Sequence, residues 1–155
     1  MSYIESGKQA GAKVATGGER FGETGGWYIE PTVFTDVTRD MKIVQEEIFG
    51  PVIVLVKFKD EAEALKLAND SAFGLSSAII TENLSRAVRV ANGLEAGSVF
   101  VRLRDSLMTE EWQRGTPSDC IAQVNGSFSP MAQMPFGGVK QSGFGRDLGE
   151  DALHE

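Results

Sequence analysis

The stretch Gln45-Glu46-Glu47-Ile48-Phe49-Gly50-Pro51 runs directly into Val52-Ile53-Val54-Leu55-Val56. The second half is the apolar, β-branched run that a buried strand requires, and Gly50-Pro51 interrupts regular structure just before it. A strand has no need of the two adjacent carboxylates and the aromatic residue in the first half. We therefore expect a function, and not the strand, to explain why they stand here.

Strands and helices alternate in the sequence that follows this run. The spacing predicts a strand ending near Phe58, a helix capped by Asp60, a strand over 76–81, a helix capped by Asn83 or Ser85, and a strand over 98–101. Such alternation is typical of a parallel sheet with flanking helices, joined by right-handed crossovers. We therefore predict an α/β fold.

The sequence before Gln45 is less regular. A weakly amphipathic helix within 1–14 is interrupted by glycine, and a short strand is expected at 14–16. An aromatic and β-branched strand is predicted over 27–34, where Pro31 favours an edge position or a bulge. Asp40 is expected to cap a short helix over 41–45, which leads into the opening stretch.

Composition excludes several classes of function. The 155 residues have the length of one ordinary domain, and the net charge of −7 includes no cluster of lysine or arginine, so we expect neither nucleic acid nor a membrane as a partner. The longest apolar run is too short to span a bilayer, and residues 1–9 lack the apolar core of a secretory signal. These features predict a cytoplasmic protein, with an organelle matrix as the alternative.

Cys120 is the single cysteine, which excludes an internal disulfide and a multi-cysteine zinc site.

Two later segments depart from the alternation. No sustained period is visible from about residue 102 to 123, and we expect an irregular insertion there, with order returning at Pro135. The segment 135–149 carries five glycines, a density that marks backbone bending sharply or lying close to a neighbour. Its glycine spacing does not match the dinucleotide-binding, P-loop or nucleophile-elbow patterns.

Several of these stretches together resemble the NAD(P)-dependent aldehyde dehydrogenase superfamily. The resemblance rests on Glu46-Glu47-Ile48-Phe49-Gly50-Pro51 and on Pro135-Phe136-Gly137-Gly138-x-Lys140-x-Ser142-Gly143-x-Gly145-Arg146. The stretches 69–75 and 94–101 are similar to the family as well, in the same order. The resemblance covers nearly the whole chain apart from the insertion, and it implies the C-terminal part of the family's catalytic domain.

The resemblance assigns roles to three residues. It implies that Glu47 accepts hydrogen bonds from the hydroxyls of the nicotinamide ribose of NAD or NADP, and that Phe49 lies against the cofactor near the nicotinamide. Phe136 resembles an aromatic residue that lines the aldehyde tunnel. The alternatives are that Glu46 and Glu47 are solvated loop carboxylates and that both phenylalanines belong to the core. The glycines of 135–149 are interpreted as backbone constraints.

The resemblance also shows what we do not expect in this chain. The family oxidises an aldehyde to a carboxylic acid by attack of a cysteine thiolate, hydride transfer to NAD(P)+ and hydrolysis by a glutamate-activated water. Cys120 has no matching motif around it, so we expect the nucleophile upstream of this sequence. The isolated chain is therefore predicted to be inactive. Asp147 stands where the family usually has glutamate, and His154 is interpreted as a surface residue.

Two broader expectations follow from the resemblance. The family suggests a homo-oligomer for the full-length protein, which acts on an aldehyde that these residues do not identify. The insertion at about 102–123 resembles a retained intron or a gene-model error, because Val101 would otherwise be followed by Asn125. The alternative function is a non-catalytic α/β fragment that binds a partner through an open sheet edge and an exposed apolar face.

Overall fold

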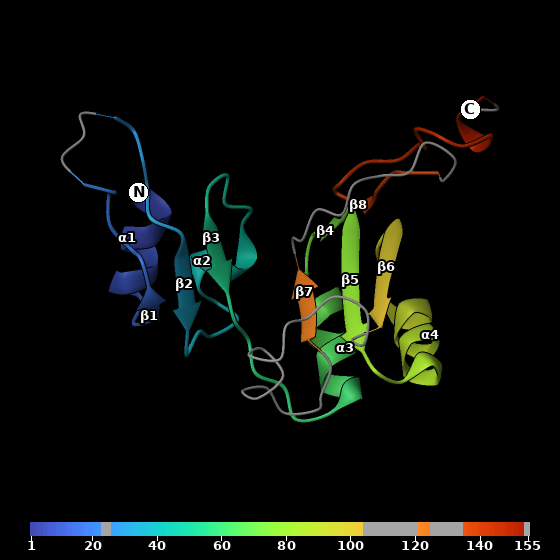
Figure 1. The fold of residues 1–155 in the computed structure, drawn as a ribbon, viewed down its shortest axis with the longest axis horizontal. Coiled ribbons are helices and arrows are strands. Elements are labelled where there is room, and N and C mark those ends of the chain that lie inside the picture. The colour runs from blue at the N-terminus through green and yellow to red at the C-terminus, as the bar shows by residue number, and fades with distance from the viewer. Residues whose placement is uncertain (23–25, 104–120, 125–134, 154–155) are drawn as a thin grey trace. The chain divides into compact units, whose positions relative to one another are not determined.

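The computed structural model describes residues 1–22, 26–103, 121–124 and 135–153. The chain forms two compact units, Met1–Phe58 and Lys59–Glu155, and each is described here by itself (Figure 1). Both units combine helices with a β-sheet, so the predicted α/β class is confirmed.

The first unit packs two helices with a three-stranded sheet. The strand order is β1-β2-β3, in which β1 and β2 are antiparallel and β2 and β3 are parallel. In chain order its elements are α1 (Ser2–Gln9), β1 (Lys13–Thr16), β2 (Thr32–Thr35), α2 (Lys42–Gln45) and β3 (Val52–Val54).

The core of the first unit joins both helices to the central strand. Ile4 of α1, Phe34 of β2 and Ile43 of α2 are almost completely buried together. Gly7 weakens the helical pattern of α1 in the sequence, but a Cβ at this position would lie 2.9 Å from Ile43 Cδ1 and 3.0 Å from Phe34 Cζ. Glycine therefore allows the close approach of α1 that closes this core.

The second unit is built on the sheet β6-β5-β7, beside which α3 and α4 pack (Figure 1). The strand β5 pairs with β6 in parallel and with β7 in antiparallel, and β4 pairs with β8 in a separate two-stranded sheet. The elements are α3 (Glu61–Asn69), β4 (Phe73–Gly74), β5 (Ser76–Thr81), α4 (Leu84–Gly93), β6 (Ser98–Leu103), β7 (Ile121–Val124), β8 (Val139–Lys140) and a 3-10 helix (Asp151–Leu153).

Both helices of the second unit begin where the sequence predicted. The Asp60 carboxylate accepts a hydrogen bond from the Glu63 N–H (2.8 Å), and the Asn83 side chain accepts one from the Arg86 N–H (2.9 Å). Such caps satisfy amide groups that the first helical turn leaves without partners. Of the two proposed caps for α4, Asn83 is therefore the correct one.

The run after Pro51 forms β3, which pairs in parallel with β2 of the same unit, and β5 and β6 form a parallel pair in the second unit. Two predictions about the first unit are wrong. The strand predicted over 27–34 starts only at Thr32, and it is central and not at an edge. Pro31 precedes the strand and so removes none of its ladder hydrogen bonds. The other alternative, a bulge, is found in the pairing with β1, between Val14 and Thr16. Asp40 does not cap α2; its carboxylate accepts from the Thr38 hydroxyl (2.6 Å).

The predicted insertion contains regular structure at both ends. β6 continues to Leu103, and β7 lies inside the segment that we expected to be irregular. A four-residue strand is too short to show a period in the sequence, and β7 is ordered by pairing along β5, as in Ser77↔Val124. The remainder of the insertion, 104–120, lies outside the described residues.

Replacing Glu61 should loosen the contact between α3 and α4 in a pH-dependent way. Arg89 donates from Nε and Nη2 to the two carboxylate oxygens of Glu61 at 2.7 and 2.8 Å, and these hydrogen bonds hold the pKa of Glu61 below its ordinary value of 4.5. The stabilisation is therefore complete well above pH 4.5 and is lost as the pH falls through the lowered pKa.

We expect amide exchange in α4 to be faster in the E61Q variant than in the wild type at pH 7. The difference should shrink as the pH falls through the lowered pKa of Glu61, and E150Q, which removes a carboxylate charge in the same unit, should leave α4 unchanged. Equal exchange in E61Q and wild-type protein at pH 7 would contradict this prediction.

Candidate functional site

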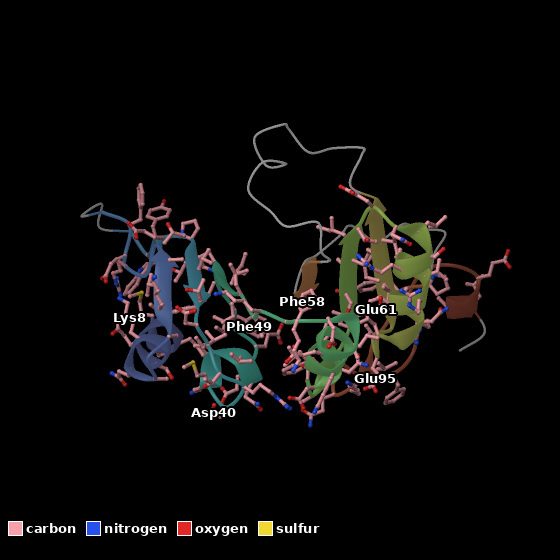
Figure 2. All side chains as sticks on the ribbon, turned by 90° about the horizontal axis from the view of Figure 1, so that it is seen from below. Lys8, Asp40, Phe49, Phe58, Glu61 and Glu95 are labelled. Atoms are coloured by element: carbon pink, nitrogen blue, oxygen red, sulfur yellow. The ribbon has the colours of Figure 1, made fainter. Side chains whose placement is uncertain are left out.

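The candidate site in the first unit is the segment 46–50 between α2 and β3. The chain leaves α2 at Glu46 in an extended conformation, with φ −111° and ψ 152°. Ile48 is partly buried and packs against the core, whereas Glu47 is exposed and Phe49 is 92% exposed. The segment therefore turns Ile48 inward and leaves its two neighbours outside, as Figure 2 shows for Phe49.

The two adjacent carboxylates have different surroundings. Glu46 Oε2 accepts a hydrogen bond from the Tyr3 hydroxyl at 2.8 Å, which raises the pKa of Tyr3, and it lies 3.8 Å from Lys42 Nζ. Within the part of the chain that the structure describes, the Glu47 carboxylate has no hydrogen bond or ion pair. Of the two carboxylates, Glu47 is the one that is available to a ligand.

The exposed pair suits a ligand that carries both hydroxyl groups and a flat ring. A carboxylate has two oxygens that accept hydrogen bonds, so it matches two neighbouring hydroxyls of a sugar. An exposed phenyl ring offers a face on which a planar heterocycle can lie. The alternative that Phe49 is a core residue does not hold for this chain.

Among the described residues, no group of three His, Cys, Asp or Glu side chains could hold a metal ion.

Phe136 lies in the second unit, on the glycine-rich segment 135–149, and is partly buried. Its N–H donates to the Asp147 carbonyl and its carbonyl accepts from the Asp147 N–H, both at 2.7 Å. Arg146 Nη1 donates to the carbonyls of Gly138 (3.0 Å) and Gly145 (2.8 Å). The segment therefore folds back on itself, and Phe136 is held where its two arms meet.

The interpretation of the glycines as backbone constraints is confirmed. A Cβ on Gly97 would overlap the Gly137 carbonyl, and one on Gly137 would overlap the Gly145 carbonyl. Gly143 and Gly145 have φ values of 103° and 88°, which residues with a side chain rarely adopt. These glycines bring backbone to backbone.

The glycine-rich segment is fastened to the rest of the second unit by what we call the Lys140 anchor, formed by Lys140, Asn69 and Glu95. Lys140 Nζ lies 2.6 Å from Glu95 Oε2 and donates to the carbonyls of Asn69 (2.8 Å) and Ser71 (3.2 Å). The Asn69 side chain donates to the Gly93 carbonyl (2.7 Å) and accepts from the Glu95 N–H (2.9 Å). Glu95 is labelled in Figure 2.

This anchor was not predicted from the sequence. The stretches 69–75, 94–101 and 135–146, which the anchor joins, stood out in the sequence, but the reason for their composition did not. Ser142 adds a further link, because its Oγ accepts from the Gly74 N–H at 3.0 Å. The presence in each stretch of one polar residue, Asn69, Glu95 or Lys140, was the signal that could have suggested a shared network.

Two further residues from the sequence analysis cannot be placed. Cys120 and His154 lie outside the described residues. Glu47 and Phe49 are brought together on one segment of the first unit, and Phe136 belongs to the second unit.

Among the described residues, no helix is both long and apolar enough to span a bilayer.

Removing the ammonium group of Lys140 should release the glycine-rich segment. In the K140M variant, we expect the free energy of unfolding of the second unit to fall by about 1–2 kcal/mol, because charged hydrogen bonds at a partly exposed group are lost. Urea denaturation measures the change, and amide exchange at β4 and β8 locates it. K66M, which removes an exposed lysine of α3, is the control; equal effects of the two substitutions would contradict the assigned role.

The chain is similar to known aldehyde dehydrogenases over nearly all its residues. The model of the aldehyde dehydrogenase family matches residues 1–113. An aldehyde dehydrogenase of Emericella nidulans is 49% identical over 153 residues, which cover 99% of this chain and 26% of the relative. A mitochondrial aldehyde dehydrogenase of Leishmania tarentolae is 42% identical with the same coverage.

A solved structure shows the same similarity to aldehyde dehydrogenases. An NAD+ complex of an aldehyde dehydrogenase from Bacillus cereus superposes with a TM-score of 0.78 at 44% identity and covers 98% of this chain and 26% of that protein. The chain thus spans about a quarter of the length of the relatives that it matches. Both the match of the family model and the likeness in fold lead to one conclusion: the chain belongs to the aldehyde dehydrogenase family.

Proposed function

We propose that this chain provides the nicotinamide-ribose end of the cofactor site in an NAD(P)-dependent aldehyde dehydrogenase, which oxidises an aldehyde to a carboxylic acid. The observation that carries the proposal is the exposed, unengaged Glu47 carboxylate beside the 92% exposed Phe49. The bound NAD+ in the related Bacillus cereus structure supports the choice of cofactor.

Each residue has a definite part in this proposal. Glu47 accepts hydrogen bonds from the two hydroxyls of the ribose and thereby fixes the orientation of the sugar. Phe49 lies against the nicotinamide and keeps water from that side of the ring. When bound, NAD(P)+ supplies the acceptor for the hydride. The free carboxylate and the bare ring fit these requirements, and no residue of this chain is assigned to the pyrophosphate or the adenine.

Phe136 is proposed to line the passage through which the aldehyde reaches the reacting centre. Its support is the fixed backbone at the meeting point of the two arms of the glycine-rich segment. A partly buried phenylalanine in such a place selects for apolar substrate groups without identifying one aldehyde.

The full-length protein is proposed to be a homo-oligomer in the cytoplasm or in an organelle matrix. The matrix alternative is supported by the name of the Leishmania tarentolae relative, which is called mitochondrial. Residues that choose between NAD and NADP are not assigned in this chain.

A partner-binding role is a second candidate because of the edge of the first sheet. β3 is an edge strand in the order β1-β2-β3, and Ile53, Leu55 and Val56, in and just after it, are each more than 40% exposed. Unpaired edges with exposed apolar side chains favour association. This candidate does not compete with the first, because the cofactor segment precedes β3.

The 155-residue chain alone should oxidise no aldehyde. Its single cysteine, Cys120, has no matching motif around it, so the thiolate that attacks the aldehyde is not expected from this chain. Formation of NADH or NADPH from a panel of aldehydes should equal a blank without protein. Turnover above the blank would show that the nucleophile has been assigned to the wrong part of the protein.

Binding of the cofactor fragment nicotinamide mononucleotide tests the role of Glu47. E47Q should bind it about tenfold more weakly than the wild type, since charge-assisted hydrogen bonds contribute about 1.5–3 kcal/mol. E150Q removes an exposed carboxylate elsewhere and is the matched control. The dissociation constants come from chemical shift changes on titration. Equal affinity of E47Q and E150Q would refute the assignment.

A further inference from the structure

The carboxylate next to the proposed ligand-binding group is committed to a cluster of its own, formed by Tyr3, Lys42 and Glu46. Glu46 Oε2 accepts from the Tyr3 hydroxyl at 2.8 Å and lies 3.8 Å from Lys42 Nζ. Lys42 Nζ also lies 5.0 Å from the centroid of the Tyr3 ring, within the range of a cation–π interaction. Each member of the cluster therefore contacts the other two.

The cluster is fixed to the rigid part of the first unit. Tyr3 precedes Ile4 on α1, Lys42 precedes Ile43 on α2, and both isoleucines are at most 2% exposed. The Glu46 N–H also donates to the Lys42 carbonyl (3.0 Å) at the end of α2. Both the backbone and the side chain of Glu46 are therefore tied to elements that the core holds in place.

The cluster contributes little to overall stability. The side chains of Lys42 and Glu46 are 54% and 51% exposed, and ion pairs at such positions contribute about 0–1 kcal/mol. The cluster instead affects the orientation of the neighbouring side chains. With Glu46 tied toward α1 and Ile48 packed on the core, Glu47 between them is left exposed, as Phe49 is.

We propose that Tyr3 and Lys42, acting through Glu46, are positioning residues that hold Glu47 and Phe49 in the geometry that receives the nicotinamide ribose. This inference rests on the proposed function of Glu47. Glu46 itself is not a ligand in this account: its hydrogen bond to Tyr3 keeps the two like charges apart and prevents Glu46 from competing for the sugar hydroxyls.

The Y3F variant tests the proposal, because it removes only the hydroxyl that holds Glu46. Y28F, which removes the hydroxyl of an exposed tyrosine in the same unit, is the control. In the full 155-residue chain without ligand, we expect amide exchange at 47–49 to be about two- to tenfold faster in Y3F, as the loss of one hydrogen bond predicts. The urea midpoint should match that of Y28F. Binding of nicotinamide mononucleotide should weaken by a similar factor.

The possible results separate this inference from the proposed function. Exchange and affinity in Y3F equal to those of Y28F would overturn the positioning role. A lower urea midpoint, with exchange raised throughout the first unit, would also overturn it, because Tyr3 would then act on general stability. Failure of the wild-type chain to bind nicotinamide mononucleotide would instead refute the proposed function, and ligand-free exchange in Y3F would still decide whether the cluster orders residues 47–49.

Discussion

The second unit depends on one polar constraint, the place at which the partly exposed Lys140 ammonium group finds its acceptors. The group reaches the Glu95 carboxylate and the carbonyls of Asn69 and Ser71, so one side chain joins three stretches that lie far apart in the sequence. A charged group of this kind loses its water only where several acceptors replace it. The joined stretches also meet through a close backbone contact between Gly97 and Gly137. A side chain at Gly97 would push these stretches apart.

The first unit shows the same principle on a smaller scale. Its core fixes α1, α2 and β2, and the polar cluster on that core commits one of two neighbouring carboxylates. Glu46 is held by Tyr3 and Lys42, and Glu47 is left to the solvent. The difference between two chemically identical side chains is therefore produced by tertiary structure. This difference explains how a short exposed segment can offer a defined acceptor to a sugar.

Sequence reasoning succeeded where the determining interactions are local. The caps Asp60 and Asn83 and the strand 76–81 were predicted correctly, because capping and hydrophobic periodicity act over a few residues. It failed where pairing partners are distant. Nothing within 121–124 indicates that β7 is ordered by pairing with β5.

The residues of the candidate site were likewise only partly predictable from the sequence. The family motif singled out Glu47 and Phe49, but it gives no physical reason why Glu47, and not Glu46, is free. That reason is the hydrogen bond of Glu46 with Tyr3, which lies 43 positions away in the sequence. Lys140 and Asn69 were missed for the same reason, since their hydrogen bond joins positions 71 apart. Contacts of this range are set by the packed chain and leave no periodic signal in the sequence.

The most direct test of this account is the carbon NMR signal of the Glu47 carboxyl group during titration with nicotinamide mononucleotide and, separately, with nicotinamide. The mononucleotide adds to the ring a ribose with its two hydroxyls and a phosphate, and the Glu46 signal controls for an effect of charge alone. The account predicts that the Glu47 signal shifts in a saturable way with the mononucleotide and stays in place with nicotinamide, while the Glu46 signal moves with neither. A Glu47 signal that ignores the mononucleotide, or that responds equally to both ligands, would contradict it.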